Sequence, residues 1–318
     1  MRLPRTLALC LGAGALLVTA ACGGDSLESQ GDGGPGGSGG NKGSVTISGQ
    51  NFTEMEIMAA MYDELLSNAG YDVTSKLVKT RDVYIKQLKS GDVDLAPEYL
   101  AGIADYLNKA ENGANAKPVT SHDPQATLKA LKSLAASYNI TMLDPSKATD
   151  QNAFAVTKEY ANKYQLATLS DLGNVEGPIT LAAAPDCPGR QDCAAGLKKV
   201  YGINISKVLP LGYGSAQTID SVKSGESQLG EVGTTQGNVP KEGLMILQDD
   251  QGIQPAQNLI PAVNSAFLDK HQDVADLLNK LAATLTTKDL IDLNGQVDLM
   301  RKKPTDVAQA YLKDKGLI

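Results

Sequence analysis

The chain has 318 residues, a length that favours two domains over one. Apolar residues make up 42 % of it, which suffices for packed cores, whereas aromatic residues make up 4 % and Trp is absent. The formal net charge is -7. Nucleic acid and anionic membrane are therefore excluded as main partners, because both require a basic protein face.

The first 43 residues are predicted to lie outside the folded body. Residues 1–21 contain two arginines, an apolar run and then small residues, which is typical of a signal peptide and too short for a stable membrane span. Cys22 follows those small residues directly, as in the lipobox of bacterial lipoproteins. Residues 22–43 are thus predicted to be a lipidated cysteine and a flexible Gly-rich tether, with an ordinary signal cleaved nearby as the alternative. We expect an exported protein, anchored by lipid to the outer face of the bacterial cytoplasmic membrane.

Two cysteines remain in the folded part. Cys187 and Cys193 enclose a short loop, and an exported protein favours a disulfide between them. A metal site is the alternative, but the spacing lacks the CxxC form and both histidines are remote in sequence.

The elements that follow the tether alternate between strand and helix, which is typical of an α/β fold. They are a strand at 45–48, a helix that starts at Thr53 with a capping box to Glu56, a strand near 73–77, a helix at 81–89 ended by Gly91, and a strand at 93–96 stopped by Pro97. The later elements are helices at 100–109, 124–139, 158–164, 266–284 and 287–302, with strands at 140–143, 152–156, 179–182 and 244–247.

An internal repeat links the two halves of this pattern. Residues 179–182 match 45–48, and 223–226 match 89–92, in both cases 134 residues further on. The constant offset predicts two related lobes that face each other across a ligand cleft. Lobe I is expected to be discontinuous, formed by residues 44–147 and 250–318, and lobe II by 148–249. Hinge closure is expected through the two crossings between them.

No catalytic set is present. The chain has only two histidines, and no nucleophile elbow, phosphate-binding loop, zinc-protease motif or dinucleotide fingerprint. The sequence therefore predicts no enzyme, cofactor or metal centre.

The remaining candidates suit binding. Tyr99 follows a strand, and its ring could hold a cationic head group, the alternative being a tyrosine packed under the hinge. Asn51 and Thr53 lie at a helix start that favours an anionic group, unless Thr53 is a plain cap. Asp82 could balance a cation.

Two further candidates lie in the second half. Arg190 could bind a carboxylate with its planar fork, with an ordinary surface arginine as the alternative. Thr234 offers a hydroxyl group from the polar turn after the repeat.

These pieces together resemble the substrate-binding lipoproteins of osmoprotectant ABC importers, whose ligands are glycine betaine, choline or carnitine. The matching segments are Asn51-Phe52-Thr53-Glu54, Lys89-Ser90-Gly91-Asp92-Val93-Asp94-Leu95, Pro97-Glu98-Tyr99, Leu143-Asp144-Pro145, Ala153-Phe154-Ala155-Val156, Arg190-Gln191-Asp192, Gly196-Leu197-Lys198-Lys199-Val200-Tyr201-Gly202, Thr234-Thr235-Gln236-Gly237 and the strand at 244–247. Their order covers essentially all of 45–318.

The resemblance implies a type II periplasmic-binding-protein fold, no enzymatic activity, and a permease with its ATPase as partners. It places Tyr99 at a position of an aromatic cage and Arg190 at that of the ligand carboxylate. Asn152, Gly233 and Ile219 stand where the family tends to have aromatic residues, so the cage is expected to hold trimethylammonium weakly. Asn152, at such a position, is itself a predicted ligand-binding residue.

We therefore expect a monomeric solute-binding protein for a quaternary ammonium or related zwitterion. A different polar solute, or a sensor role instead of import, remains an alternative.

Overall fold

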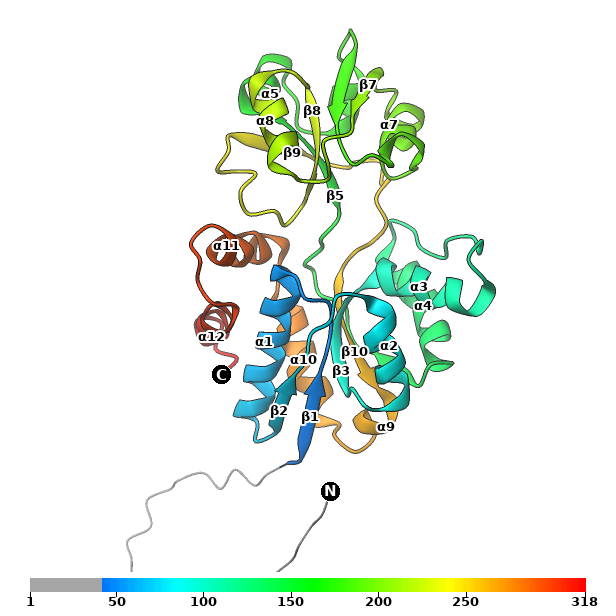
Figure 1. Cartoon of the computed structure of the whole chain (residues 1–318), viewed down its shortest axis with the longest axis vertical. Coiled ribbons are helices and arrows are strands. Elements are labelled where there is room, and N and C mark those ends of the chain that lie inside the picture. The colour runs from blue at the N-terminus through cyan, green and yellow to red at the C-terminus, as the bar shows by residue number, and fades with distance from the viewer. Residues whose placement is uncertain (1–41) are drawn as a thin grey trace, which may run out of the picture. The chain divides into compact units, whose positions relative to one another are not determined.

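The computed structural model describes residues 42–318, so the predicted signal peptide, Cys22 and almost all of the predicted tether lie outside the described part. Within that part the strands form two five-stranded sheets flanked by helices (Figure 1). This arrangement confirms the predicted two-lobed α/β fold.

Sheet one has the strand order β2-β1-β3-β10-β4. Its strands are β1 (Ser44–Ile47), β2 (Asp72–Ser75), β3 (Leu95–Tyr99), β4 (Ile140–Met142) and β10 (Leu259–Asn264). The helices around it are α1 (Thr53–Asn68), α2 (Arg81–Ser90), α3 (Leu100–Asn112), α4 (Pro124–Ala136), α9 (Ser265–Leu268), α10 (Asp273–Thr284), α11 (Thr287–Asp298) and α12 (Pro304–Asp314). We call this sheet and its helices lobe one.

Sheet two has the order β7-β6-β8-β5-β9. Its strands are β5 (Asn152–Thr157), β6 (Ile179–Ala182), β7 (Ile205–Leu209), β8 (Leu229–Gly233) and β9 (Leu244–Leu247). The helices around it are α5 (Lys158–Tyr164), α6 (Leu169–Gly173), the 3₁₀ turn η1 (Cys187–Gly189), α7 (Ala194–Tyr201) and α8 (Ala216–Ser224). This is lobe two.

The two sheets repeat one topology. In each, the second strand of the order, β1 or β6, runs parallel to both neighbours, and the next two pairings are antiparallel. Strands β3 and β8 start at residues 95 and 229 and end at 99 and 233, an offset of 134 at both ends. Even a side-chain contact recurs, because Asp94 accepts the amide N–H of Thr46 and Gln228 accepts that of Thr180. Gly91 and Gly225 end the preceding helices with φ of 87° and 79°.

Two local predictions were wrong. Pro97 does not stop the strand but lies inside β3, opposite Pro261 of β10. Neither nitrogen can donate, so two prolines fit opposite each other only at a pair of the antiparallel ladder that exchanges no hydrogen bonds. Thr53 is not a helix cap either: Phe52 is the N-cap, no side chain caps it, and the Thr53 hydroxyl donates to Asp298 of α11 at 2.7 Å.

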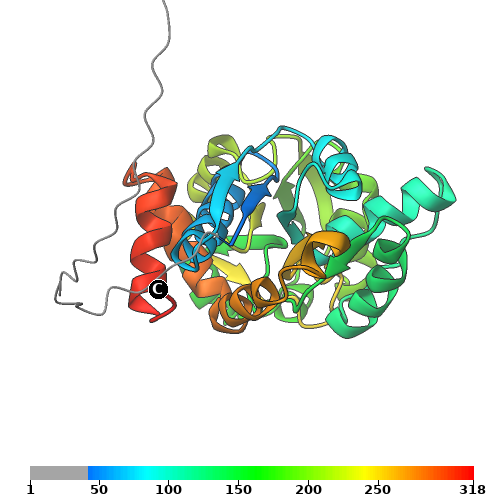
Figure 2. The ribbon, with the colours of Figure 1, turned by 90° about the horizontal axis from the view of Figure 1, so that it is seen from below.

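Each sheet is covered on both faces by apolar clusters. In lobe one, α1, α10, α11 and α12 pack on one face, while α2, α3 and α4 pack on the other. In lobe two, β5 shows the alternation directly, since Phe154 and Val156 face the cluster of α5, α6 and α7, while Ala153 and Ala155 face that of α8. Figure 2 shows helices on both sides of the strands.

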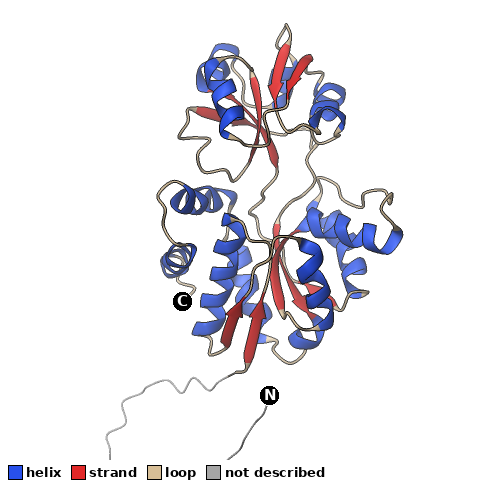
Figure 3. Ribbon diagram, viewed as in Figure 1, coloured by secondary structure: helices blue, strands red, loops and turns tan. Residues whose placement is uncertain are grey.

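Two chain segments connect the sheets, residues 143–151 between β4 and β5, and residues 248–258 between β9 and β10 (Figure 3). Because β10 pairs with β3, the C-terminal part of the chain completes sheet one. No helix among residues 42–318 combines the length and apolar character needed to cross a membrane.

Candidate functional site

A cavity of about 280 Å³ lies where segments of both lobes meet, and we call it the interlobe cavity. Its lining comes from the start and neighbourhood of α1, from the connection before β5, from the loop before α8, from the end of β8 and from α11. The residues are Phe52, Thr53, Glu54, Asp150, Tyr213, Gly214, Gly233, Thr235, Gln236, Asn294 and Asp298.

Glu54 is a carboxylate that lobe one contributes to this cavity. It lies in the first turn of α1 and is 3 % exposed. One carboxylate oxygen accepts the Tyr99 hydroxyl at 2.6 Å, and the other accepts the side-chain amide of Asn294 at 2.7 Å. Burial raises the pKa of Glu54, against the lowering effect of these hydrogen bonds and of one from Thr235.

Asp150 is a second carboxylate at the same cavity, contributed by the connection before β5. Burial, and then the negative charge of Glu54, raise its pKa from 3.8 to about 7, although the side chain and backbone of Thr235 hydrogen-bond to it. Its Oδ1 atom is buried without a hydrogen-bond partner among the described residues. Two carboxylates thus share Thr235 as donor, and their mutual repulsion favours a proton on one of them near neutral pH.

Aromatic rings reach this cavity from both lobes. Phe52, 40 % exposed, stacks nearly parallel on Tyr99 with ring centroids 6.4 Å apart. Tyr213, 45 % exposed, approaches from lobe two. A Cβ atom placed on Gly233 would lie 2.6 Å from the Tyr213 hydroxyl. Gly233 is the counterpart of Tyr99 in the repeat, so the aromatic group absent at residue 233 is supplied by residue 213 instead.

A buried ion pair holds the end of β3 in place. Glu98, 1 % exposed, accepts two hydrogen bonds from the Arg81 guanidinium at 2.8 and 3.0 Å and one from the Tyr84 hydroxyl. It also accepts the backbone N–H of Tyr99 at 3.0 Å. Glu98 thus links the guanidinium of Arg81 to the backbone of Tyr99, and it is Arg81 on α2 that is held beside Tyr99. Its neighbour Asp82, a predicted ligand residue, is exposed on α2 and lines neither this cavity nor the one at the connections described below.

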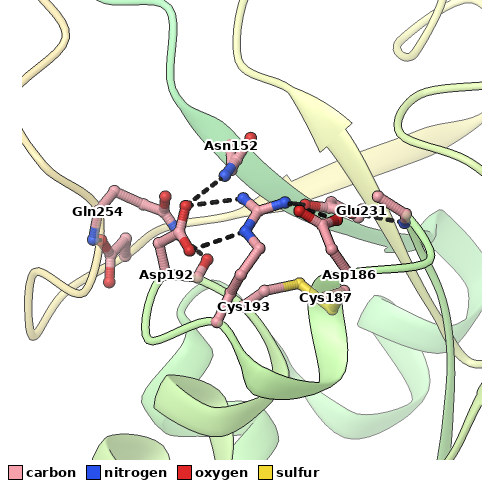
Figure 4. Close-up of polar contacts among 10 residues, drawn as sticks. Asn152, Asp186, Cys187, Asp192, Cys193, Glu231 and Gln254 are labelled. Atoms are coloured by element: carbon pink, nitrogen blue, oxygen red, sulfur yellow. Dashed lines mark hydrogen bonds and ion pairs between the residues drawn. A yellow bond between two sulfur atoms is a disulfide. The ribbon is translucent and has the colours of Figure 1, made fainter. Parts of the chain in front are cut away.

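Arg190 lies in a separate cluster of lobe two. Its guanidinium contacts Asp192 at 2.7 Å, Glu231 at 3.3 Å and Asp186 at 3.5 Å. Figure 4 shows these three carboxylates converging, with Asn152 directed at Asp192. Burial acts against ionisation of Asp192, but hydrogen bonds from Arg190 and its charge hold the pKa of Asp192 below its ordinary value. One arginine is thus matched by three carboxylates.

The predicted disulfide is present. Cys187 and Cys193 are joined, with Cα atoms 5.3 Å apart, and both are fully buried. The two backbone hydrogen bonds of the enclosed loop, from Arg190 to Cys187 and from Cys193 to Arg190, fix the course of the chain at the arginine. Glu231 lies close to both sulfur atoms, but cysteines in a disulfide offer no thiolate to a metal ion. The disulfide therefore positions Arg190.

A second cavity, of about 460 Å³, lies along the connections between the sheets, and we call it the hinge cavity. Asn152 and Thr234, both predicted ligand residues, are in its lining. Their polar groups are used internally: Asn152 donates to Asp192, and the Thr234 hydroxyl donates to the carbonyl of Thr149 and accepts from Gln151. These contacts fix the connection before β5.

The structure therefore divides the predicted site. Thr53 and, through Glu54, Tyr99 belong to the interlobe cavity. Asn152 and Thr234 line the hinge cavity, and Asn51 is exposed with its backbone N–H bonded to Val78.

Sequence reasoning missed Asp150, Tyr213 and Asn294 at the interlobe cavity. A tyrosine between two glycines, Gly212-Tyr213-Gly214, was a usable signal, because the chain has few aromatic residues and a glycine-flanked one in a loop is exposed. Asn294 had no signal, since it lies on a helix more than 200 residues from Glu54.

Two lobes joined by two connections, with charged and aromatic groups from both at one cavity, define a solute-binding protein of the two-lobed type. Comparison with known families agrees: residues 43–314 match the family described as the substrate binding domain of ABC-type glycine betaine transport systems. The chain belongs to that family and is an extracytoplasmic substrate-binding protein of an ABC importer, not an enzyme. The predicted family and the predicted role as a substrate-binding protein of an ABC importer are thereby confirmed.

Individual relatives are moderately similar. The glycine betaine-binding protein YehZ of Escherichia coli is 28 % identical over 274 residues, 83 % of this chain and 88 % of that protein. The carnitine transport binding protein OpuCC of Listeria monocytogenes is 26 % identical over 284 residues, covering 88 % and 89 %. The solved structure of apo YehZ superposes with a TM-score of 0.74 at 26 % identity, covering 86 % of this chain and 99 % of the other.

Proposed function

We propose that the interlobe cavity is the solute site and that it holds the cationic nitrogen of a quaternary ammonium solute or related zwitterion. The observation that carries this proposal is the pairing of two carboxylates, the buried Glu54 and the partly buried Asp150, with the exposed rings of Phe52 and Tyr213 at one cavity. Aromatic faces attract a cation by about 0.5–2 kcal/mol each, more where water is excluded. The names of the relatives, which bind glycine betaine and carnitine, point to the same class of solute.

The lobes proposed for this function are residues 44–147 with 250–318, and residues 148–249. Thr235 of lobe two already hydrogen-bonds to Glu54 of lobe one. A hinge motion in the two connections would bring Tyr213 of lobe two closer to Phe52 of lobe one. Closure would remove water from the solute and strengthen every charged contact in the cavity.

The proposal also covers the route of the solute. Lipidation at Cys22 would hold the protein at the outer face of the cytoplasmic membrane, and the tether to residue 43 would let it reach the permease of the importer. A monomer suffices for this role. A sensor that uses the same lobes is the alternative. Deletion of the permease separates the two: loss of growth with the solute as osmoprotectant supports import, and unchanged growth supports a sensor.

Calorimetry tests the solute site. The protein is titrated with choline, glycine betaine and carnitine, and the titration is repeated with Phe52→Ala and Tyr213→Ala. Both rings are largely exposed, so both variants are expected to fold, and each should weaken binding about three- to tenfold. Val83→Ala, an exposed apolar residue of α2 remote from the cavity lining, is the matched control. Absence of heat with all three solutes at millimolar concentration contradicts the proposal.

A further inference from the structure

We infer that the interlobe cavity selects solutes of net positive charge over zwitterions, and that Asp150 sets this preference. The inference rests on the proposed function, because it concerns the charge of the solute in that same cavity.

The charge of the cavity wall is the first support. Glu54, Asp150 and Asp298 are in the lining, and no lysine, arginine or histidine is among the described residues that line it. Such a wall stabilises a cation and repels a carboxylate, whether the carboxylate belongs to a side chain or to a solute.

Two unsatisfied acceptors are the second support. Asp150 Oδ1 and Asn294 Oδ1 are buried without a hydrogen-bond partner among the described residues. The orientation of Asn294, 6 % exposed, is fixed because its amide nitrogen donates to Glu54 and to the carbonyl of Thr235. The amide oxygen of Asn294 can only accept, and so can Asp150 Oδ1 when its carboxylate is ionised. A hydroxyl group on the solute, as in choline, supplies a donor for them, whereas a carboxylate adds another acceptor.

The third support is that the arginine predicted to bind a solute carboxylate is already paired. Arg190 is the cation that the sequence offers for it, but this side chain already contacts Asp186, Asp192 and Glu231. The cluster carries one positive and three negative formal charges. A zwitterion would have to displace a protein carboxylate from the arginine, and a cationic solute makes no such demand.

Binding of a cation should also release a proton. Asp150 faces Glu54 of α1 and Thr235 after β8, and its charge is also felt by Tyr99 at the end of β3 and by Tyr213 before α8. Asp298 of α11 lines the same cavity. These neighbours are acidic or neutral, so a solute cation is the group that would allow Asp150 to ionise fully.

The test compares choline chloride with glycine betaine by calorimetry at pH 6 and pH 8, with Asp150→Asn as the variant. Choline should bind the natural protein at pH 8 at least about tenfold more tightly than glycine betaine. Its affinity should rise about tenfold from pH 6 to pH 8, because the ionised fraction of a group with a pKa of about 7 rises by that factor. In Asp150→Asn both the preference and the pH dependence should disappear. Asp292→Asn, an exposed charge on α11, is the matched control and should change neither.

The outcomes are distinguishable. Glycine betaine binding as tightly as choline overturns the inference and leaves the proposed solute site standing. A preference for choline that survives in Asp150→Asn overturns the role of Asp150. Binding of neither solute overturns the proposed function and this inference with it.

Discussion

Replacing Asp150 by Asn is expected to stabilise the solute-free protein at pH 8 and to leave its stability unchanged well below pH 3.8. The substitution keeps the size of the side chain and removes the charge that burial and Glu54 oppose. In the folded protein the pKa of Asp150 is about 7, compared with its ordinary value of 3.8. The native state therefore holds this proton more tightly than the unfolded chain does.

The direction of the effect follows from that difference. Well below pH 3.8 the carboxyl is protonated in both states, and its ionisation does not affect stability. Between pH 4 and pH 7 the unfolded chain ionises first, so the free energy of unfolding falls as pH rises. Each pH unit in this window amounts to about 1.4 kcal/mol, and the whole window to about 4 kcal/mol; the pKa of about 7 already includes the hydrogen bonds from Thr235, which favour the ionised form. Above pH 7 the carboxyl is ionised in both states, so the free energy of unfolding falls no further.

Urea unfolding at pH 4.5, 6, 7 and 8 measures this effect, with Asp292→Asn as the control for loss of an exposed charge. The difference between Asp150→Asn and the natural protein should grow steadily across the series and level off at the highest values. A difference that is the same at every pH, or a variant that is less stable at pH 8, would refute the reasoning, since Asp150 would then be ionised without penalty in the fold.

Three other substitutions test the supports of the site. Removing the disulfide by Cys187→Ala with Cys193→Ala should lower the free energy of unfolding by about 2 kcal/mol, given the short loop, and reduction of the natural protein should reproduce the loss in a urea titration. Glu98→Gln leaves Arg81 without a counter-charge and should lower the free energy of unfolding by about 3 kcal/mol in the same assay, whereas Glu→Gln at an exposed position should leave it unchanged. Gly237→Ala places a Cβ 2.7 Å from backbone atoms of Gly295 on α11, so it should weaken solute binding in calorimetry by separating the two lobes, while the thermal midpoint changes little.

Much of the fold could be predicted from local rules. Gly91 and Gly225 end their helices with positive φ, as glycine stops do, and the strands after them begin at the predicted offset. Helix–glycine–strand junctions are common, so the repeat is visible in the sequence only because separate matches share one constant offset. Pro97 misled the same reasoning, because a proline inside a strand is tolerated only opposite a partner that needs no donor, and that partner, Pro261, lies far along the chain.

The site was less accessible to sequence reasoning, because its groups come from segments distant in the chain. Tyr99 was found at a strand end, where α/β sheets place ligand groups. Glu54, however, looks like an ordinary first-turn acid of a helix, and only its burial against Asn294 and Tyr99 shows its role. Of the two threonines in the turn after β8, the predicted Thr234 lines the hinge cavity, and it is Thr235 that lines the interlobe cavity.

The assignment of Arg190 to a solute carboxylate remains a prediction, and the structure indicates what it would require. The disulfide loop follows β6, and Asp192, which binds Arg190, also accepts hydrogen bonds from Asn152 and from Gln254 of the second connection. The three carboxylate contacts of Arg190 were not apparent from sequence, because Glu231 lies on β8, some 40 residues further on.

Gly233 explains why the second half of the repeat is not a copy of the first. Its counterpart Tyr99 covers Glu54, but a Cβ at residue 233 would lie 2.6 Å from the Tyr213 hydroxyl and 3.4 Å from Asp150 Oδ1. Because glycine has no side chain, the Tyr213 hydroxyl and Asp150 Oδ1 stay accessible from the interlobe cavity. Gly233→Ala should displace the flexible Tyr213 ring and cover the free oxygen of Asp150, which lowers choline affinity by about tenfold with little change in thermal midpoint. The ring can move at small cost, so the loss should appear in binding and not in stability. Choline affinity that is unchanged in Gly233→Ala would show that neither Tyr213 nor Asp150 contacts the solute.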